Sequence, residues 1–469
     1  MIVPPAPAAE EQRSAEAPSG LAEAACAEAT RRREPVLLSD SRPSPVLDAL
    51  QFYRRARRAG HDATYWEQPS RGTVVVAVGA VRSLTPRGEQ RFAEAAGAWQ
   101  ALVEGSVAHR PEDLVAMGGF AFASGGTRAP HWSAFGDAAL VVPELLYRCD
   151  DGGARLVRNV MVRPGESPAD VASHVTAPPW LRADPPPEPS QAPTACAVRE
   201  DPSSSGRWDA AVRALTAEIE AARVEKVVLA REVLLDARDE IDEIGALARL
   251  RAGYPDCTVF AVHRGGATLI GATPERLVRV DGRRVRVSCL AGSARRGAGS
   301  EDDAAIGAAL LADGKERREH QLVVGMIADA LVPLCRDIDV PPEPALMRMP
   351  NVQHLHTPVE GTLAGDVGVL ALVERLHPTP AVGGLPRAGA LRLLRRWESF
   401  DRGWYAGPVG WVDARGDGEF AVAIRSALLC GREAHLFAGC GIVAGSDPRR
   451  EYEESSLKLR PMLWALNQA

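Results

Sequence analysis

The connections between successive apolar segments are short, and this feature most constrains the fold. Across residues 35–180, apolar segments such as TVVVAVGAV, AALVVPELLYRC and GARLVRNVMV alternate with turns. Parallel strands need long crossover connections, whereas antiparallel strands can be joined by tight turns. The segments therefore predict mainly antiparallel strands, with one helix across residues 89–103.

The second half of the chain continues this pattern with more helices. A long strand is predicted at VEKVVLAREVLLDA (224–237), followed by strands at CTVFAVHR, ATLIGATPERLVRV, RRVRVSCLAG, WYAGPVGWVDA, GEFAVAIRSALL and FAGCGIVAG. Helices are predicted near residues 207–222, 241–252, 301–313, 315–335 and 387–397. Because strands and helices do not alternate as βαβ units, we expect an α+β fold in which large antiparallel sheets pack together with helices on the outside.

A last helix is predicted to follow the glycine-rich segment FAGCGIVAG near the C-terminus. Asp447 suits the N-cap, and Pro448 suits the first helical position, where its missing N–H costs nothing. Pro461 is expected to kink or end the helix, because proline removes a backbone hydrogen bond.

The chain divides by composition into four parts. Residues 1–34 are rich in Ala, Glu, Pro and Arg and are expected to be a disordered or weakly helical tail, with a short helix over 20–32. Residues 35–180 form the N-terminal part of the folded unit. The Pro/Ser-rich segment 181–206 is predicted to be a linker, and residues 207–469 form the candidate catalytic region.

Charge and cysteine content exclude several classes of protein. The net charge of −6 and the lack of a basic block argue against nucleic-acid binding. No apolar run approaches the ~18 residues of a membrane span, and the N-terminus lacks the pattern of a signal peptide. The eight cysteines are scattered without a CxxC pair, which indicates reduced thiols in a cytoplasmic enzyme.

Lys226 lies on the predicted strand 224–237, on one face with apolar residues. Such a lysine is either an edge-strand residue with its ammonium in water or a buried amine with a lowered pKa, which could act as a general base. The strand pattern alone favours the edge position. Glu275 ends a strand at GATPERL and could be a general acid if a pocket raises its pKa, although a surface charge is the simpler interpretation.

Carboxylates recur on two predicted helices. Glu451, Glu454 and Lys458 share one face of the last helix, and Glu319 shares a face with other charged residues in KERREHQLVV. Glu319 and Glu454 together would suit Mg²⁺, which prefers one or two carboxylates with water and substrate oxygens. A zinc site at His320 lacks the HExxH spacing. Most charged helical faces are simply solvated, and that alternative stays open here.

Arg425 lies in EFAVAIRSALL, where strand alternation would place it among alanines on one face. Space around a guanidinium suits a carboxylate-binding surface, and an arginine pointing to solvent is the alternative. The segments CLAGSARRG and FAGCGIVAG each place glycine beside small residues at strand ends. Both would allow a ligand to approach backbone N–H groups, although each could be an ordinary turn.

The motifs taken together, in this order, resemble the chorismate-utilising enzymes. The resemblance covers residues 205–466 through KVVLAR, GATPERL, LAGSARRG, KERREH, VQHLHT, LHPTPAVGG, DRGWYAGPVGW, AIRSALL, FAGCGIVAGS and EYEESSLKL. In the first half, YWEQP and GEQRF are similar to the isochorismate synthases of salicylate-forming siderophore pathways. The resemblance implies one integrated α/β unit of packed antiparallel sheets, with the segment 181–206 as an external excursion.

The resemblance also implies roles for individual residues. Lys226 would be the general base that activates water, and Glu275 the general acid on the opposite face of the substrate ring. Glu319 and Glu454 would hold Mg²⁺ against the ring carboxylate, with Glu451 close behind. The implied substrate-binding residues are Arg425 and Tyr405, for the enolpyruvyl carboxylate, together with Gly292, Ser293, His354, Ala381, Gly439, Gly441 and Lys458.

Within the family, three positions favour an isochorismate synthase, a Mg²⁺-dependent isomerase. Ammonia-using anthranilate synthases typically carry glutamine in place of Lys226, so no glutaminase subunit is expected. Aminodeoxychorismate synthases carry lysine where this chain has Ala291, and salicylate synthases often have threonine in place of Ala381. The implied reaction adds water at C2 of chorismate with loss of the C4 hydroxyl.

Several implications stay open at this stage. Salicylate synthesis by further elimination of pyruvate is the alternative function, and a non-catalytic chorismate-binding subunit ranks lower because every implied catalytic group is present. A downstream pyruvate lyase or isochorismatase would drain the reversible reaction into salicylate, dihydroxybenzoate/siderophore or menaquinone synthesis. The oligomeric state, monomer or dimer, is not predicted.

Overall fold

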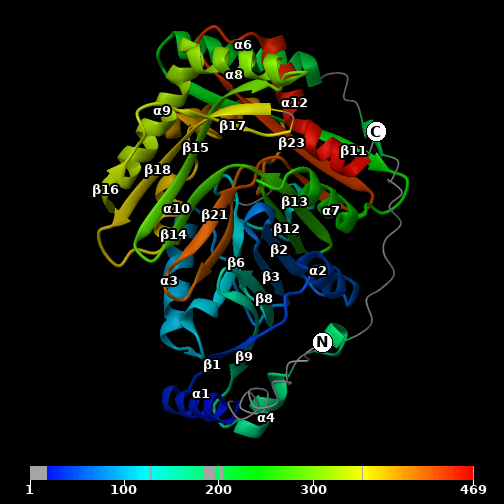
Figure 1. The fold of residues 1–469 in the computed structure, drawn as a ribbon, viewed down its shortest axis with the longest axis vertical. Helices are drawn as coiled ribbons and strands as arrows, with labels where there is room; N and C mark the ends of the chain where they lie inside the picture. The colour runs from blue at the N-terminus through cyan, green and yellow to red at the C-terminus, as the bar shows by residue number, and fades with distance from the viewer. Residues whose placement is uncertain are drawn as a thin grey trace, which may run out of the picture.

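The fold is built from two large sheets with helices around them (Figure 1). The computed structural model describes residues 18–125, 129–176, 178–182, 196–199, 204–350 and 352–467. Within these residues, strands pair antiparallel throughout except for the short parallel pair of β1 and β5. The predicted α+β class with packed antiparallel sheets is therefore confirmed.

The larger sheet has 13 strands. Its order is β10 (Cys196–Arg199), β11 (Lys226–Ala237), β23 (Glu433–Ile442), β22 (Ser426–Cys430), β13 (Ala267–Thr273), β12 (Thr258–Arg264), β2 (Ala63–Gln68), β3 (Thr73–Val78), β8 (Leu145–Asp150), β9 (Gly153–Val162), β1 (Val36–Pro43) and β5 (Val107–Ala108), with β19 (Gly384–Leu385) paired to β11.

The second sheet has 10 strands. Its order is β16 (Cys335–Asp339), β18 (Val352–Leu363), β15 (Arg284–Arg295), β14 (Arg276–Asp281), β21 (Gly418–Val422), β20 (Pro408–Asp413), β6 (Val115–Phe120), β7 (Ala138–Val142) and β4 (Arg82–Leu84), with β17 (Ala345–Arg348) paired to β18.

Strands from both halves of the chain share both sheets. Strand β2 pairs with β12 in the larger sheet, and β6 pairs with β20 in the second sheet. The main hydrophobic core lies between the sheets and includes Phe120, Trp404 and Phe420. These pairings tie the two halves together across long separations in sequence.

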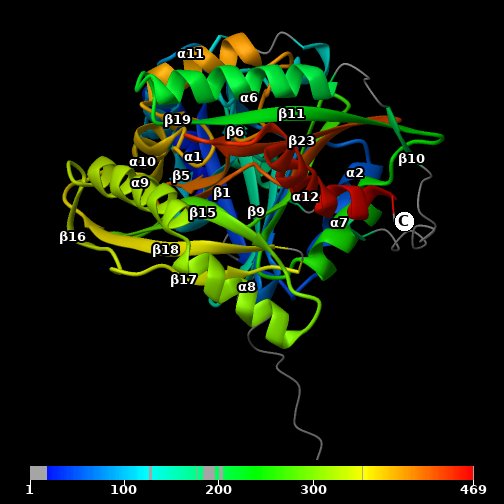
Figure 2. The same cartoon turned by 90° about the horizontal axis from the view of Figure 1, so that it is seen from above.

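The described helices cover the sheets from outside. They are α1 (Pro18–Arg32), α2 (Ala49–Arg58), α3 (Arg91–Glu104), α4 (Pro168–His174), α5 (Pro179–Arg182), α6 (Ser204–Glu220), α7 (Glu243–Gly253), α8 (Ser300–Ala312), α9 (Gly314–Leu331), α10 (Val369–Leu376), α11 (Arg387–Trp397) and α12 (Pro448–Asn467). Helix α9 packs on β15 and β18, and α12 packs on β23. Seen from above, α9 and α12 flank the strands that carry the candidate site (Figure 2).

The N-terminal tail and the linker are described in part. The helix expected over 20–32 is found as α1, whose alanines pack on Val36 and Leu38 of β1. Residues 1–17 lie outside the described part of the chain, as does most of the segment 181–206. Within that segment, β10 pairs with β11, so these four residues extend the larger sheet.

One local prediction was wrong, and the expected end of the last helix near Pro461 is not found. The segment GEFAVAIRSALL forms two strands, β21 and β22, which belong to different sheets. Arg425 lies between them at a φ of +51°, so alternation along a single strand does not place its side chain. Helix α12 runs through Pro461 because the residues around and after it, including Leu459, Met462 and Leu466, are buried in the core. Their packing offsets the lost backbone hydrogen bond.

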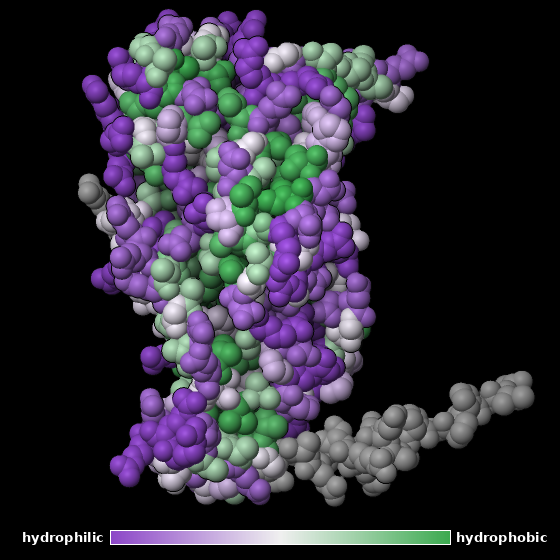
Figure 3. All heavy atoms as spheres, turned by 90° about the vertical axis from the view of Figure 1, so that its left-hand side faces the viewer, coloured by the Kyte–Doolittle hydropathy of each residue, from purple (hydrophilic) through white to green (hydrophobic). Residues whose placement is uncertain are grey.

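The surface is mixed in character. On the face shown in Figure 3, hydrophobic residues form green areas among hydrophilic ones. Exposed large hydrophobic residues of the described chain are scattered at Val46, Val198, Val332 and Trp464, as on ordinary globular proteins. Among the described helices, none has the length and apolar character needed to cross a membrane.

Candidate active site

One cavity of about 110 Å³ gathers the residues predicted from the sequence. It lies among β11, β23, β15 and β18 and the helices α9 and α12. All of the predicted site residues line it: Lys226, Glu275, Gly292, Ser293, Glu319, His354, Ala381, Tyr405, Arg425, Gly439, Gly441, Glu451, Glu454 and Lys458. The roles of these residues in catalysis, metal binding and substrate binding stay predictions.

Lys226 is buried at the start of β11, with 2% of its surface exposed. Its Nζ atom lies 2.7 Å from Oε1 of Glu319, which α9 presents from the opposite side. The edge-strand position that the strand pattern favoured is therefore wrong. Burial raises the pKa of Glu319, but the charge and hydrogen bond of Lys226 together with the charges of Lys458 and Lys315 lower it by more, so the pKa of this carboxyl lies below its usual value.

Gly441 makes room for this ion pair. Gly441 lies on β23, opposite Val228 of the neighbouring strand β11. A Cβ atom at Gly441 would lie 2.8 Å from Cε of Lys226 and 2.9 Å from Oε1 of Glu319. Any larger residue would therefore displace the pair, so the glycine is required here by close approach.

Glu275 follows β13 and Pro274 and is also buried. Its backbone holds it in place, since its N–H donates to Oγ1 of Thr273 and its carbonyl accepts from the N–H of Val422. Burial raises the pKa of Glu275 to about 7, although the charges of Lys226 and Lys458 oppose the shift. A carboxyl with this pKa holds a proton near neutral pH and can donate it, as a general acid must.

Carboxylates from α9 and α12 meet on one wall of the cavity. Burial, together with the charges of Glu319 and Glu454, raises the pKa of Glu316 to about 7. Burial and the charge of Glu454 also raise the pKa of Glu451. Carboxyl groups that repel one another in this way suit a divalent cation, which would neutralise them and prefers oxygen ligands.

Helix α12 begins as predicted. Asp447 caps it, with Oδ1 accepting from the N–H of Arg450, and Pro448 is the first helical residue. Lys458 lies one turn after Glu454, and its Nζ is 2.7 Å from Oε1 of that residue. The same Nζ donates to the carbonyl of Gly439, at 3.0 Å. Gly439 was expected to offer its N–H to a ligand, and the contact found uses its carbonyl.

Arg425 is held in the cavity by weak contacts. Its Nη1 donates to the carbonyl of Lys458, and its Nη2 lies 3.4 Å from Nε2 of His354. Among the described residues, no carboxylate lies within ion-pair distance of this guanidinium. Burial, with the charges of Arg425 and Lys458, lowers the pKa of His354 to about 3, so its imidazole is neutral. A buried guanidinium with free donors can bind a substrate carboxylate.

Small residues and an aromatic complete the walls. Oγ of Ser293 lies 2.8 Å from Nδ1 of His354, which fixes the imidazole beside Arg425. Gly292 adopts a φ of +78°, where the chain bulges between β15 and β18. Tyr405 stacks on Phe437 with ring centroids 5.1 Å apart.

All the lysines of the chain line this cavity. Lysine occurs at three positions among 55 Lys and Arg residues, namely Lys226, Lys315 and Lys458. A guanidinium stays charged in proteins, whereas an amine can lose its proton when its surroundings favour the neutral form. All three amines of lysine side chains in the chain are therefore on residues that line one cavity.

Some lining residues were given no role from the sequence. Glu316 precedes Glu319 by three residues on the same helical face, so the spacing that indicated Glu319 also contained Glu316. Arg402 is fixed by Glu398 and by the carbonyls of Val382 and Val228, and nothing in the local sequence predicted it. His320 contacts the carbonyl of Ala291 and the hydroxyl of Thr357.

Comparisons with known proteins agree with this arrangement. Residues 23–467 match the family described as chorismate binding enzyme. The chain is 40% identical to the salicylate biosynthesis isochorismate synthase of Pseudomonas aeruginosa, over 96% of this chain and 94% of that protein. It is 38% identical to the isochorismate synthase MenF of Bacillus subtilis, over 92% of this chain and 93% of that protein.

A solved structure is also similar. The menaquinone-specific isochorismate synthase MenF from Escherichia coli matches with a TM-score of 0.76 and 26% identity, covering 95% of this chain and all of that chain. The family match and both sequence similarities extend over nearly the whole chain. The chain belongs to the chorismate binding enzyme family.

Proposed function

We propose that the protein is an isochorismate synthase, which converts chorismate to isochorismate. The observation that carries the proposal is the placement of two proton-transfer groups on one cavity: the buried amine of Lys226 and the carboxyl of Glu275, whose pKa is raised to about 7. Relatives named isochorismate synthase, similar over nearly the whole chain, support it.

The reaction needs a base and an acid. In our proposal, the amine of Lys226 takes a proton from water as its oxygen bonds to C2 of the substrate ring. The ring double bond shifts, the bond between C4 and its hydroxyl breaks, and Glu275 gives its proton to the departing oxygen, which leaves as water. One water is consumed and one released, so the net reaction is an isomerisation. Base and acid would act from groups that line one cavity.

Mg²⁺ is the cation that we propose for the acidic wall. Glu319 and Glu454 would hold it, with Glu451 close behind and Glu316 beside Glu319. The raised pKa values of Glu316 and Glu451 support a cation at this wall. When bound, Mg²⁺ would neutralise a substrate carboxylate and the carboxylates of this wall.

The other lining residues would bind and orient the substrate. Arg425 offers free guanidinium donors to a carboxylate, and Tyr405 lies nearby with its hydroxyl as a further donor. Lys458 adds a positive charge on the same side. His354, kept neutral and fixed by Ser293, would hold Arg425 in position. Gly292, Ala381, Gly439 and Gly441 would leave room for the ring.

Water as the nucleophile needs no ammonia source, so we propose that the enzyme works without a glutaminase subunit. The product would be drained by a downstream enzyme that acts on isochorismate, in a salicylate, siderophore or quinone pathway. We also place the enzyme in the cytoplasm, because the described cysteines are free thiols, which are typical of reducing compartments.

The test is incubation of the purified, chelator-treated protein with chorismate, with and without added Mg²⁺. We expect isochorismate in the chromatogram only when Mg²⁺ is present, and its absence under both conditions would contradict the proposal. A lactate-dehydrogenase assay for pyruvate distinguishes the alternative, because a salicylate synthase would release pyruvate and salicylate from this protein alone. In a Glu454→Gln variant, the Mg²⁺ concentration for half-maximal activity should rise.

A further inference from the structure

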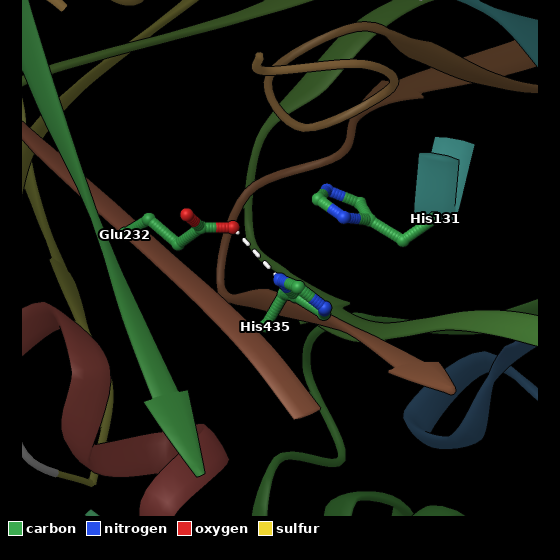
Figure 4. A group of neighbouring side chains, drawn as sticks. All are labelled: His131, Glu232 and His435. Atoms are coloured by element: carbon green, nitrogen blue, oxygen red, sulfur yellow. Dashed lines mark hydrogen bonds and ion pairs between the residues drawn. The ribbon is translucent and has the colours of Figure 1, made fainter. Parts of the chain in front are cut away.

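A second group of metal-ligating side chains lies outside the cavity. His131 comes from the short 3-10 helix η4 (Pro130–Trp132), Glu232 from β11 and His435 from β23. One ligand atom from each lies within 4.8 Å of the others. Figure 4 shows the three side chains converging from these elements, with Glu232 and His435 joined directly.

The two strands bring Glu232 and His435 together by register. Glu232 lies opposite Phe437, and His435 lies opposite Leu234, so the two side chains are diagonal neighbours on one face of the sheet. Oε1 of Glu232 is 2.8 Å from Nδ1 of His435. A carboxylate and an imidazole nitrogen in contact are already close to the arrangement that a shared metal ion requires.

His131 lies beside the pair of Glu232 and His435. Its ring faces that of His435, with centroids 3.9 Å apart and planes 31° apart. Its Nε2 atom is buried and, among the described residues, has no hydrogen-bond partner. Burying a polar atom without a hydrogen-bond partner lowers the stability of the fold. Binding of a metal ion by this imidazole would account for its position.

We propose that His131, Glu232 and His435 form a second metal site, specific for a transition ion of the zinc type. Two imidazoles and one carboxylate are the ligand set of many zinc sites, whereas Mg²⁺ prefers oxygen ligands alone. Ligand atoms of tetrahedral zinc are roughly 3.4 Å apart, and those of the three residues lie within 4.8 Å of one another, so the imidazoles would rotate toward a shared ion on binding. His131 and Glu232 also border a cavity of about 1000 Å³, from which water could complete the coordination.

Negative charge near His131 and the fixed position of Trp132 support the proposed metal site. Glu232, Asp401 and Glu433 place negative charge near His131, which favours a cation. The adjacent Trp132 is fixed by its Nε1 donating to the carbonyl of Asp401, at 3.1 Å. A bound ion would therefore tie the 129–135 loop to β11 and β23.

The site also has a route to the candidate active site. Trp132 stacks on Phe437 at 5.9 Å, and Phe437 stacks on Tyr405, which lines the chorismate cavity. The ion would hold Trp132 against this stack. The inference does not depend on the proposed function, because the three ligands lie outside the cavity that carries it.

The test uses Co²⁺ as a spectroscopic substitute for zinc. The full-length protein is stripped with a chelator and titrated with Co²⁺ in excess Mg²⁺, which occupies the carboxylate wall. We expect one equivalent of Co²⁺ to give the intense visible bands of a four- or five-coordinate ion, and Zn²⁺ to displace it. Zn²⁺ should also raise the melting temperature of the protein by several degrees.

The matched variants are His131→Phe, which keeps the ring stacking but removes the nitrogen ligands, and Glu232→Gln. Both should lose the Co²⁺ bands and the thermal shift. The control is His263→Ala, since His263 pairs with Asp62 at 2.7 Å in the same way but is not part of the cluster. Absence of the bands in the wild type, or equal Co²⁺ binding by His131→Phe, would overturn the proposal.

Discussion

Nζ of Lys226 lies 2.7 Å from Oε1 of Glu319, and the pair is enclosed between β11, β23 and α9. Two opposite charges removed from water together are stable only as a pair, because loss of one partner leaves the other charge buried. The pair also joins the proposed base to a proposed metal ligand.

Two substitutions of Lys226 distinguish the contribution of its positive charge from its role as a base. Lys226→Arg keeps a cation beside Glu319 but cannot act as a base, whereas Lys226→Gln loses both. We expect each variant to lose at least about 100-fold in kcat, the usual contribution of a general base. Circular dichroism checks the fold of both. If Lys226→Arg kept near wild-type turnover, Lys226 would serve only as a partner for Glu319.

Gly441→Ala should reduce activity through sterics alone. The added Cβ would lie 2.8 Å from Cε of Lys226, so the ion pair must shift. We expect kcat to fall by at least about tenfold, because small displacements of catalytic groups are costly. The control is Gly325→Ala in α9, where nothing lies within 4 Å of the added atom. That variant should be about 0.5–1 kcal/mol more stable and fully active. Equal activity of the two variants would contradict the close-approach argument.

Glu275 should make the stability of the protein depend on pH. Its pKa is raised to about 7 by burial, so the folded state retains a proton that the unfolded state has lost. Stability is thus fully present at low pH and is lost as pH rises from about 4.5 through about 7. Glu275→Gln has no carboxyl to titrate, so its stability should not fall in this way. Its free energy of unfolding, measured relative to that of the wild type, should rise by about 3 kcal/mol between pH 5 and pH 8.

Urea unfolding at the two pH values measures this difference. Glu453→Gln is the control, since its side chain is 61% exposed. An equal response of Glu275→Gln and Glu453→Gln to pH would show that Glu275 titrates normally. In the wild type, kcat should also fall as pH rises above about 7, because the general acid is then deprotonated.

The sequence predicted the sheets and the cavity lining because both follow from local patterns. Short turns between apolar segments indicated antiparallel pairing, and ordered motifs identified the residues around the cavity. The burial of Lys226 could not be predicted, because it depends on α9 covering a strand some ninety residues earlier in the chain. The pairing of β2 with β12 likewise joins segments that no local pattern connects.

The error at Arg425 has a different cause. EFAVAIRSALL alternates like one strand, yet the backbone turns to a φ of +51° at Arg425 and passes from one sheet to the other. An alternating pattern does not reveal such a corner when both flanking segments are buried. Arg425 lines the cavity, and the corner rather than strand alternation sets the position of its side chain.

Arg425→Lys should weaken substrate binding. A lysine cannot offer the paired donors of a guanidinium to a carboxylate, and its shorter reach changes the contacts with His354. We expect the KM for chorismate to rise at least about tenfold, with a smaller change in kcat, in steady-state kinetics. Arg449→Lys is the control, with its side chain 88% exposed on the same helix as Lys458. An unchanged KM in Arg425→Lys would remove Arg425 from the substrate site.

The most direct measurement is the origin of the hydroxyl oxygen in the product. The reaction is run with chorismate and Mg²⁺ in water labelled with heavy oxygen and quenched well before equilibrium, and the isochorismate is analysed by mass spectrometry. If Lys226 activates water for attack at C2, each product molecule carries one labelled oxygen at C2. Unlabelled isochorismate would mean that the hydroxyl migrates from C4, and it would contradict the roles given to Lys226 and Glu275.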